Sequence, residues 1–311
     1  MGAVLAALGG AVWIRSRRKT ASRDPDAPPL RAPLPQRNKL GKYLLGDIIA
    51  DGGTATVYRA TDDEGHILAV KIPHADLLTS KEFVATFHHE ASIGETLRHP
   101  SIVAVLEVGQ YQAGGYKKIP YFVMEYLDGQ DLRSIIRSRG RLPPQEAARI
   151  TRSIADALDW AHHRGVTHRD ISPRNIFVTR QKRVKVMDFG ISTVQSRVTH
   201  KRTKALSLGT PEYLAPERIN DPASADSRSD LYSLGCVLFE MLHGHPPFVA
   251  PTPVETLKMH RKAPVPEPHP SLDLPPGLWP ILLKLLEKNP EKRFQSAGAV
   301  TSALADIAPD S

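Results

Sequence analysis

The sequence predicts an α+β fold with a strand-rich first half and a mainly helical second half. Short alternating apolar and polar runs, separated by Gly and Asp turns, dominate residues 43–125. Apolar residues then recur at helical spacing over residues 130–307. At 311 residues the chain is long enough to bury two modest cores. We therefore expect two lobes, 43–125 and 130–307, within one domain that spans 43–307.

The first lobe is predicted to contain a five-stranded antiparallel sheet and one helix. Three strands are expected at 43–49, 56–60 and 66–71, because Asp- and Gly-rich turns separate them. A helix is expected over about 80–97. Two further strands, near 102–110 and 121–125, flank a Gly-rich hairpin and complete the sheet.

The second lobe is predicted to be built mainly from helices. Helical periodicity and a Pro143-Pro144 start predict the elements at 131–139, 144–164, 230–242, 278–288 and 296–307, with a Pro-rich loop over 264–276. The chain has one cysteine, Cys236, inside the strongly apolar helix, so an intrachain disulfide is excluded. A reducing compartment and a buried thiol are the natural interpretation.

The net charge of +8 is concentrated near the N-terminus. Residues 15–42 hold nine Lys/Arg and two Asp, a net +7, which leaves +1 for all the other residues. The predicted domain is therefore almost neutral, which argues against nucleic acid as a partner. A basic, Pro-rich linker beside an apolar segment is more typical of contact with an anionic membrane surface.

Residues 1–14 are apolar and leave two interpretations open. As a helix they would cover about 20 Å, against about 30 Å of membrane hydrocarbon. They are therefore a short membrane anchor, with the rest of the chain on the cytoplasmic side, or a disordered or mis-assigned start. Residues 15–42 form the linker in both cases.

A Gly-containing turn between the first two predicted strands is a candidate phosphate site. It comprises Ala50, Asp51, Gly52, Gly53 and the residues up to Val57. Small residues allow backbone amides to approach a phosphate closely. An ordinary hairpin turn explains the same residues.

A second candidate site lies between His168 and Asp188. Asp170 and Asn175 stand five positions apart in a predicted loop, where the aspartate can serve a hydroxyl nucleophile and the asparagine a metal ion. A short apolar strand precedes Asp188, which supplies another carboxylate suited to a metal.

The order His168-Arg-Asp170 to Asn175, followed by Asp188-Phe-Gly190, resembles the catalytic and magnesium-binding loops of eukaryotic-like (Hanks-type) bacterial serine/threonine protein kinases. The resemblance covers residues 43 to about 307. It implies the bilobal protein kinase fold, ATP and Mg²⁺ as cofactors, and transfer of phosphate to protein Ser or Thr hydroxyls.

The resemblance also implies roles for individual residues. Asp170 would accept or orient the substrate hydroxyl, and Asn175 and Asp188 would bind Mg²⁺. Lys71, held by Glu90, would contact the ATP phosphates. The remaining nucleotide contacts would come from the turn residues Ala50, Gly52, Gly53 and Val57, from Ala69, from the backbone of Glu125 and Leu127 with Met124 behind the adenine, and from Asp131 at the ribose.

The segment Gly209–Glu217 resembles the substrate-docking segment of the serine/threonine members of the family, and tyrosine kinases usually differ there. The resemblance implies that Thr210 faces Asp170 and that Glu217 pairs with Arg293. Asp230 would brace the catalytic loop. Protein substrates are therefore the expected partners.

Four positions depart from the family pattern. Ser172 stands where lysine is usual, and Arg174 is expected to replace that cation unless it is a solvated loop residue. Ala50 and Ala55 stand at two of the three glycine positions of the phosphate loop. Gly94 replaces a bulky apolar residue, so we expect a packing gap and a loosely held helix that needs activation or a partner.

The residues leave regulation and two alternative classes open. Thr203 and Ser207 are candidates for autophosphorylation, with Arg169 as the phosphate contact. A nucleotide-binding pseudokinase or scaffold is the alternative that the departures favour. A small-molecule phosphotransferase normally lacks a docking segment like Gly209–Glu217. The sequence predicts no particular oligomeric state.

Overall fold

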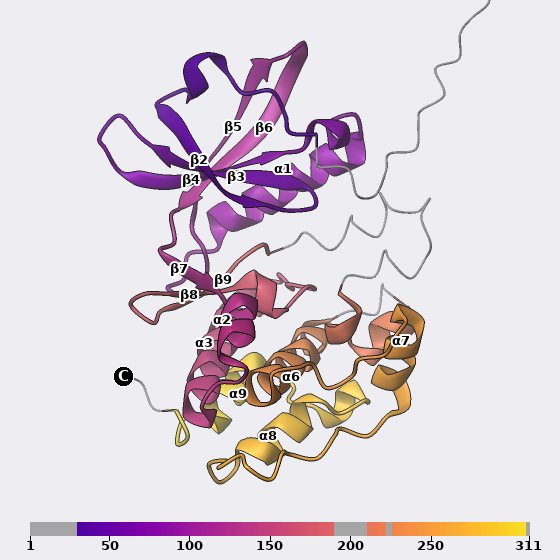
Figure 1. Cartoon of the computed structure of the whole chain (residues 1–311). Coiled ribbons are helices and arrows are strands. Elements are labelled where there is room, and N and C mark those ends of the chain that lie inside the picture. Colours follow the sequence, from indigo (N-terminus) through magenta and orange to yellow (C-terminus); the bar gives the residue numbers. More distant parts are fainter. Residues whose placement is uncertain (1–29, 190–209, 222–225, 309–311) are drawn as a thin grey trace, which may run out of the picture.

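A computed structural model describes residues 30–189, 210–221 and 226–308 and shows a two-lobed molecule (Figure 1). The upper lobe is built on a β-sheet, and the lower lobe consists mainly of helices. The predicted bilobal α+β fold is confirmed. Both lobes have their own buried apolar cluster, as the length of the chain suggested.

The upper sheet contains six strands in the order β1-β2-β3-β4-β6-β5, and all neighbouring strands are antiparallel. The strands are β1 (Lys39–Leu40), β2 (Tyr43–Asp51), β3 (Ala55–Thr61), β4 (Ile67–Pro73), β5 (Val105–Ala113) and β6 (Tyr116–Glu125). The five predicted strands are present. The two-residue strand β1 adds a sixth at the edge, because the buried Leu40 continues the apolar face.

The residues just before β2 are part of the upper lobe. Ala32 and Leu40 are buried, Leu30 accepts a hydrogen bond from the backbone of Ala75, and the Tyr111 hydroxyl donates to the carbonyl of Pro33 at 3.0 Å. Residues 30–42, which the composition assigned to a linker, thus pack against the sheet of the upper lobe. The reason is that their apolar side chains are buried in its core.

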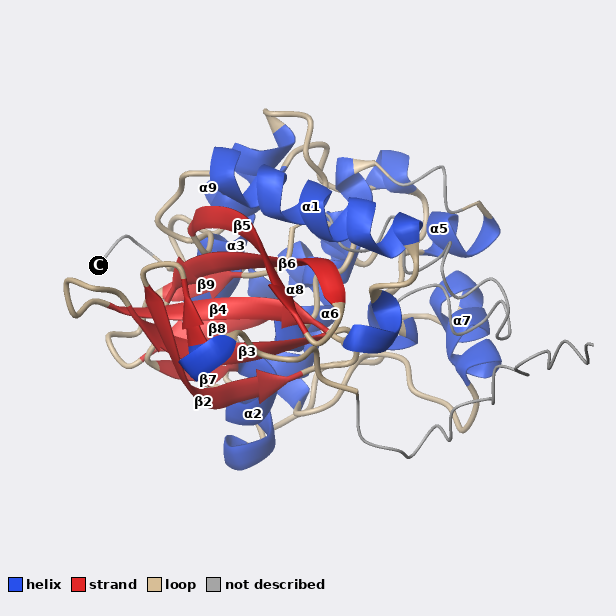
Figure 2. Cartoon of the chain, turned by 90° about the horizontal axis from the view of Figure 1, so that it is seen from above, coloured by secondary structure: helices blue, strands red, loops and turns tan. Residues whose placement is uncertain are grey.

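The helix α1 (Lys81–Thr96) lies beside β5 and β6 (Figure 2). The Ser80 side chain caps its first turn by accepting a hydrogen bond from the backbone of Phe83. Phe87 and Ala91 on its buried face pack with Val105 and Phe122 of the sheet. The sheet therefore fixes the side of α1 that carries Glu90.

The prediction of a packing gap at Gly94 is wrong. Val105 of β5 fills the space, since a Cβ atom added to Gly94 would lie 2.3 Å from its Cγ2 atom. The absence of a side chain allows the strand to approach the helix closely instead of leaving a void. In the structure α1 is held against the sheet.

The lower lobe combines a small sheet with helices. Its strands are β7 (Gly129–Asp131), β8 (Ile176–Thr179) and β9 (Val184–Val186), which pair antiparallel in that order. Its α-helices in the described residues are α2 (Leu132–Arg139), α3 (Pro144–His162), α5 (Pro216–Asn220), α6 (Ser227–His243), α7 (Pro253–Lys262), α8 (Leu278–Leu285) and α9 (Ala297–Ala303).

The sequence predicted five of these helices to within a few residues and gave no element for α5 or α7. The sequence nevertheless contains an N-cap pattern for α7. The Thr252 hydroxyl accepts from the backbone of Glu255 and donates to the Glu255 carboxylate at 2.8 Å, and Pro253 occupies the first turn. Thr-Pro-Val-Glu is a capping-box pattern, so a helix start was present in the residues.

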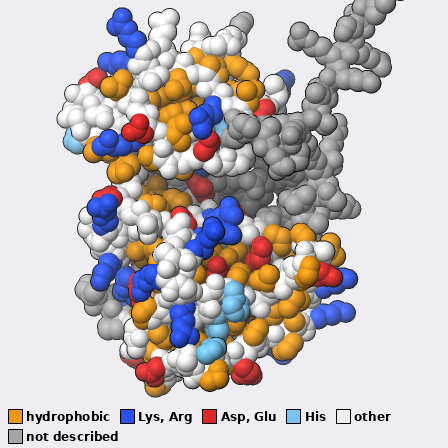
Figure 3. All heavy atoms as spheres, in the orientation of Figure 1, with side chains coloured by type: hydrophobic (Ala, Val, Ile, Leu, Met, Phe, Trp, Pro, Cys, Tyr) orange, Lys and Arg blue, Asp and Glu red, His pale blue; other side chains and the backbone are white. Residues whose placement is uncertain are grey.

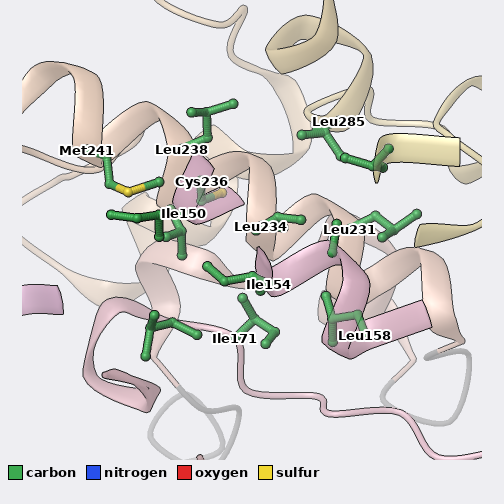
Figure 4. Close-up of a cluster of buried hydrophobic side chains, with 14 of the residues drawn as sticks. Ile150, Ile154, Leu158, Ile171, Leu231, Leu234, Cys236, Leu238, Met241 and Leu285 are labelled. Carbon is green, nitrogen blue, oxygen red and sulfur yellow. The ribbon is translucent and has the colours of Figure 1, made fainter. Parts of the chain in front are cut away.

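The centre of the lower lobe is α6, whose residues from Ser229 to Leu242 are all buried. Ile150 and Ile154 of α3 and Leu285 of α8 pack around it (Figure 4). Cys236 lies inside this cluster with no exposed surface, as predicted, and burial raises the pKa of its thiol.

The membrane prediction concerns residues outside the described ranges. Residues 1–14 and the linker up to residue 29 belong to that part of the chain. Within the described ranges, no helix is both long enough and apolar enough to cross a bilayer.

Candidate functional site

A cleft of about 1050 Å³ lies between the lobes. It brings together residues that the sequence placed far apart, from the β2–β3 turn to the loop after β9. The predicted site residues that line it are Ala50, Gly52, Gly53, Val57, Ala69, Lys71, Glu90, Glu125, Leu127, Asp131, Asp170, Arg174, Asn175 and Asp188. Thr210 lies beside Asp170 in a small adjoining cavity.

Lys71 joins the two lobes. Its Nζ atom donates to Glu90 Oε1 of α1 at 2.9 Å and to Asp188 Oδ1 of the lower lobe at 2.9 Å. Burial opposes the charged form of Lys71, but the carboxylates of Asp188 and Glu90 outweigh it and raise the pKa of this ammonium group. Burial also raises the pKa of Glu90. The cleft therefore holds a fixed cation where phosphate groups can be bound.

Asp170 and Asn175 are joined in one loop. Asn175 Nδ2 donates to the Asp170 carbonyl at 2.8 Å and to Asp170 Oδ2 at 2.9 Å. The backbone N–H of Asp170 donates to His168 Nδ1 at 3.2 Å, and Nε2 of the same ring donates to the Met187 carbonyl at 2.7 Å. The carboxylate orientation is thus set by neighbours before any substrate arrives, and burial raises the pKa of Asp170.

The buried Asp230 of α6 holds the backbone of this loop. Its two carboxylate oxygens accept from the N–H groups of His168 at 2.8 Å and Arg169 at 2.7 Å, while His162 contacts one of them at 2.9 Å. Arg169 has φ 67°, a conformation that is costly for a non-glycine residue. The hydrogen bonds to Asp230 stabilise that conformation and lower the pKa of the carboxyl despite its burial.

The donor set at Asn175 and Asp188 suits a hard divalent cation such as Mg²⁺. Because Asn175 donates its hydrogen bonds to Asp170 from the side-chain nitrogen, the side-chain oxygen of Asn175 is available as a metal ligand. Asp188, at φ 61°, presents its carboxylate to the cleft and uses one oxygen on Lys71. In the described residues no group of three or more His, Cys, Asp or Glu side chains could hold a metal ion by itself. A bound cation would therefore complete its coordination with ligand or water oxygens.

The β2–β3 turn presents small residues to the cleft. Asp51 anchors the turn by accepting from Thr56 at 2.9 Å and from Arg31 at 2.7 Å, and it contacts His74 at 3.2 Å. The backbone N–H of Gly52 donates a hydrogen bond to the Ala55 carbonyl within the turn. At Gly53, in contrast, an added Cβ atom would have no other atom within 4 Å. Gly53 therefore leaves room for a ligand.

The connection between the lobes runs through Glu125. Its carboxylate accepts from Lys185 Nζ of β9 at 2.6 Å and from the backbone of Ala104 at 2.8 Å. Leu127 lines the cleft beside it. Asp131 also lines the cleft, but its carboxylate caps α2 through hydrogen bonds to Ser134.

The positions around Ser172 differ sharply in exposure. Ser172 is 2 % exposed, so its short side chain is enclosed by the protein. Arg174 is exposed and lines the cleft. Of these two positions, only Arg174 thus presents a side chain to the cleft.

Sequence reasoning missed Arg218, which lies below the loop. It is buried, it donates to the carbonyl of Arg169, and it lines the small cavity that contains Asp170 and Thr210. Its charge opposes the burial effect on the pKa of Asp170. Nothing in its neighbours along the chain marks it, because its acceptor is 49 positions away.

Sequence reasoning also missed Lys185, for which a signal existed. A lysine between Val184 and Val186 interrupts an apolar strand, the same pattern that singled out Lys71. The side chain is buried against Glu125.

The docking segment is fixed to the lower lobe by a buried ion pair. Arg293 donates through both terminal nitrogens to the two oxygens of Glu217, at 2.7 and 2.8 Å. Asp230 and Glu217 occupy the places that the resemblance implied. Thr203 and Ser207 lie outside the described residues.

Comparisons with known proteins agree with this arrangement. The family described as "Protein kinase domain" matches residues 43–304. The chain is 41% identical over 268 residues to the "Serine/threonine-protein kinase PknB" of Mycobacterium leprae, which covers 86% of this chain and 43% of that protein. It is 40% identical over 276 residues to the protein of that name in Mycolicibacterium smegmatis, covering 86% and 44%. The chain thus spans less than half the length of these relatives.

Proposed function

The chain belongs to the protein kinase domain family, among the bacterial serine/threonine protein kinases, and from that membership we propose that it transfers the γ-phosphoryl group of ATP to Ser or Thr hydroxyls of proteins. One observation carries the proposal. Lys71 is paired with Glu90 and Asp188 at the same time as Asn175 holds Asp170, so the groups that phosphoryl transfer requires are assembled together.

In the proposed reaction, Asp170 orients the substrate hydroxyl and accepts its proton while that oxygen bonds to the γ-phosphorus and the bond to the ADP oxygen breaks. Lys71 would hold the ATP phosphates, and Asn175 and Asp188 would hold Mg²⁺. When bound, Mg²⁺ neutralises charge on the phosphate oxygens. Thr210, next to Asp170, would position the acceptor residue.

The nucleotide would bind between the lobes. Ala50, Gly52, Gly53 and Val57 would cover the phosphates, Ala69 and the backbone of Glu125 and Leu127 would surround the adenine, and Asp131 would face the ribose. All of them line the same cleft, which supports the assignment. We assign Arg174 to the transferring phosphoryl group, as the exposed cation that stands in for the lysine missing at Ser172.

A radiolabelled-ATP assay with a generic protein substrate tests the proposal. Wild-type protein with Mg²⁺ is expected to label Ser or Thr, and Asp170→Ala is expected to remove most of that label. Nucleotide binding without transfer by the wild type would indicate a pseudokinase or scaffold. Labelling of small molecules alone would indicate a small-molecule phosphotransferase.

We extend the proposal to autophosphorylation at Thr203 or Ser207. Along the sequence, four basic residues stand near these two hydroxyls and would pair with a phosphate: Arg197, Lys201, Arg202 and Lys204. Mass spectrometry after incubation with ATP and Mg²⁺ is expected to find one of the two sites modified. An unmodified segment in an active preparation would contradict this extension.

We also propose that residues 1–42 bring the cytoplasmic kinase domain to an anionic membrane surface. The basic residues of 15–42 are the support for this, since each contributes about 1 kcal/mol near such a surface. Co-sedimentation with phosphatidylserine vesicles is expected for the full chain. It should be lost when residues 1–29 are removed, and equal sedimentation of both would contradict it.

A further inference from the structure

Three arginines stand at the lower edge of the cleft. Arg133 and Arg137 come from α2 and Arg174 from the loop that carries Asp170, and all three line the cleft. Figure 3 shows Lys and Arg side chains gathered at this edge, over α2. These three residues are hereafter the arginine rim.

The arginine rim differs from its neighbours in ion pairing within the part of the chain that the structure describes. None of its members forms an ion pair there, whereas nearby Arg139 pairs with Glu146 at 2.8 Å and Arg180 with Asp128 at 3.0 Å. Arg133 and Arg137 are also four positions apart on one helix, where like charges repel. An anionic ligand would remove this repulsion.

The helix geometry directs these cations away from the core. Leu132 and Ile136 of α2 are buried in the lower lobe, whereas Arg133 is half-buried and Arg137 is exposed. Lys71 and the Asn175–Asp188 pair already account for charge in the interior of the cleft. The two helix arginines therefore lie outside the region that phosphate groups need.

Arg133 also lies close to the docking side of the lobe. Burial raises the pKa of Tyr213 and of Glu240, and the charge of Arg133 opposes that rise in both. Tyr213 belongs to the segment Gly209–Glu217. The charge of Arg133 thus reaches the docking segment, on which the proposed protein substrate would lie.

We propose that Arg133 and Arg137 of the arginine rim bind acidic side chains of the protein substrate beside the phosphorylated Ser or Thr, so that the enzyme selects acidic sequences. The inference rests on the proposed function. The guanidinium group matches a carboxylate with two parallel hydrogen bonds and is always charged. For exposed pairs of this kind, we expect each helix arginine to contribute about two- to fivefold in kcat/KM.

Synthetic peptides test this substrate class with the full chain. Each peptide has one serine, with three Asp, three Ala or three Lys on one flank, and a second set carries them on the other flank. One Asp-flanked peptide is expected to exceed its Ala counterpart about tenfold in kcat/KM, and the Lys counterpart to fall below it. The preference should weaken as ionic strength rises.

Variants assign the preference to the helix. Arg133→Gln/Arg137→Gln is expected to bring the Asp/Ala ratio of kcat/KM close to one, and Arg133→Glu/Arg137→Glu should favour the Lys peptide. Lys258→Gln/Lys262→Gln removes two exposed charges on α7, away from the cleft lining, and should keep the wild-type ratio. Thermal melting verifies that each variant is folded.

The outcomes separate this inference from the proposed function. Phosphorylation of the Ala peptide without an Asp preference would overturn the inference alone, and so would a preference that survives in Arg133→Gln/Arg137→Gln. Transfer to no peptide and to no site on the chain itself would overturn both.

Discussion

The replacement of a catalytic cation that we propose for this loop rests on Arg174 and Ser172. Ser172 is buried and short, while Arg174 projects at the cleft two positions later. A charge that acts on the transferring phosphoryl group must reach the cleft, and Arg174 is the exposed cation of this loop that lines it.

Arg174→Ala is therefore expected to lower kcat about tenfold or more, with a smaller effect on the KM for ATP. Arg174→Lys keeps the charge and should recover part of the loss. Steady-state rates at saturating peptide measure the effect. An unchanged kcat in Arg174→Ala would remove this residue from the mechanism.

Arg218 is expected to act on Asp170 through the pH dependence of the rate. In the proposed mechanism Asp170 must be ionised to accept a proton. Burial raises its pKa and Asp188 raises it further, whereas interactions with His168, the hydrogen bond from Asn175 and the charge of Arg218 lower it. Removing the cation in Arg218→Met should move the acid limb of kcat/KM to higher pH. Arg218→Lys should move it back.

A pH–rate profile of kcat/KM for the three proteins checks this, with melting temperatures as the control for folding. A lower rate in Arg218→Met with an unshifted acid limb would mean that Arg218 only supports the loop backbone through Arg169.

At the scale of elements, the contact between α1 and β5 controls where Glu90 stands. Gly94 and Val105 are complementary in volume, so Gly94→Ala gains about 1 kcal/mol of helix propensity but overpacks the contact at a cost of about 1–3 kcal/mol. Gly94→Ala is therefore expected to destabilise the upper lobe and lower the rate. In a Val105→Ala background the same change should stabilise it.

Urea denaturation of the two single variants and the double variant measures this coupling. If Gly94→Ala stabilises the wild-type background, Val105 can move aside at little cost, and α1 is less constrained than the close contact indicates.

How far the sequence could predict each element depends on the range of the interactions involved. The strands and long helices were predictable because their apolar periods are local, and the motif order brought Lys71, Asp170, Asn175 and Asp188 into one expected site. The volume match between Gly94 and Val105, and the bond from Arg218 to the Arg169 carbonyl, join residues distant along the chain. No local pattern encodes such pairs, whereas the cap of α7 was encoded at Thr252 and overlooked.

At the scale of the whole molecule, the Glu217–Arg293 pair ties the docking segment to the last part of the lower lobe. Arg293 is 2 % exposed, so Glu217→Ala would leave a buried charge unpaired and is expected to cost about 3–5 kcal/mol of unfolding free energy at pH 7. Glu291→Gln breaks the more exposed pair with Arg228 and should cost at most about 1 kcal/mol.

The same pair predicts the acid stability of the fold. Burial opposes ionisation of Glu217, but the hydrogen bonds and charge of Arg293 outweigh it and hold its pKa below the usual 4.5. The unfolded chain therefore binds a proton more readily, and stability present above pH 4.5 is lost as the pH falls through the lower, folded value. Urea titrations between pH 7 and 3 should show a shallower acid loss in Glu217→Ala. A parallel loss in both proteins would contradict this.

The burial of Cys236 at the centre of α6 makes its thiol a natural probe of how often the lower lobe opens. A thiol with no exposed surface and a raised pKa reacts with a reagent only while the surrounding helices are apart. Because the chain has no second cysteine, the labelling rate counts those openings without any engineered probe. A ligand that binds only the closed cleft should lower the labelling rate of Cys236 if the helices around α6 open together with the cleft. The labelling rate should stay unchanged if the helices and the cleft open independently.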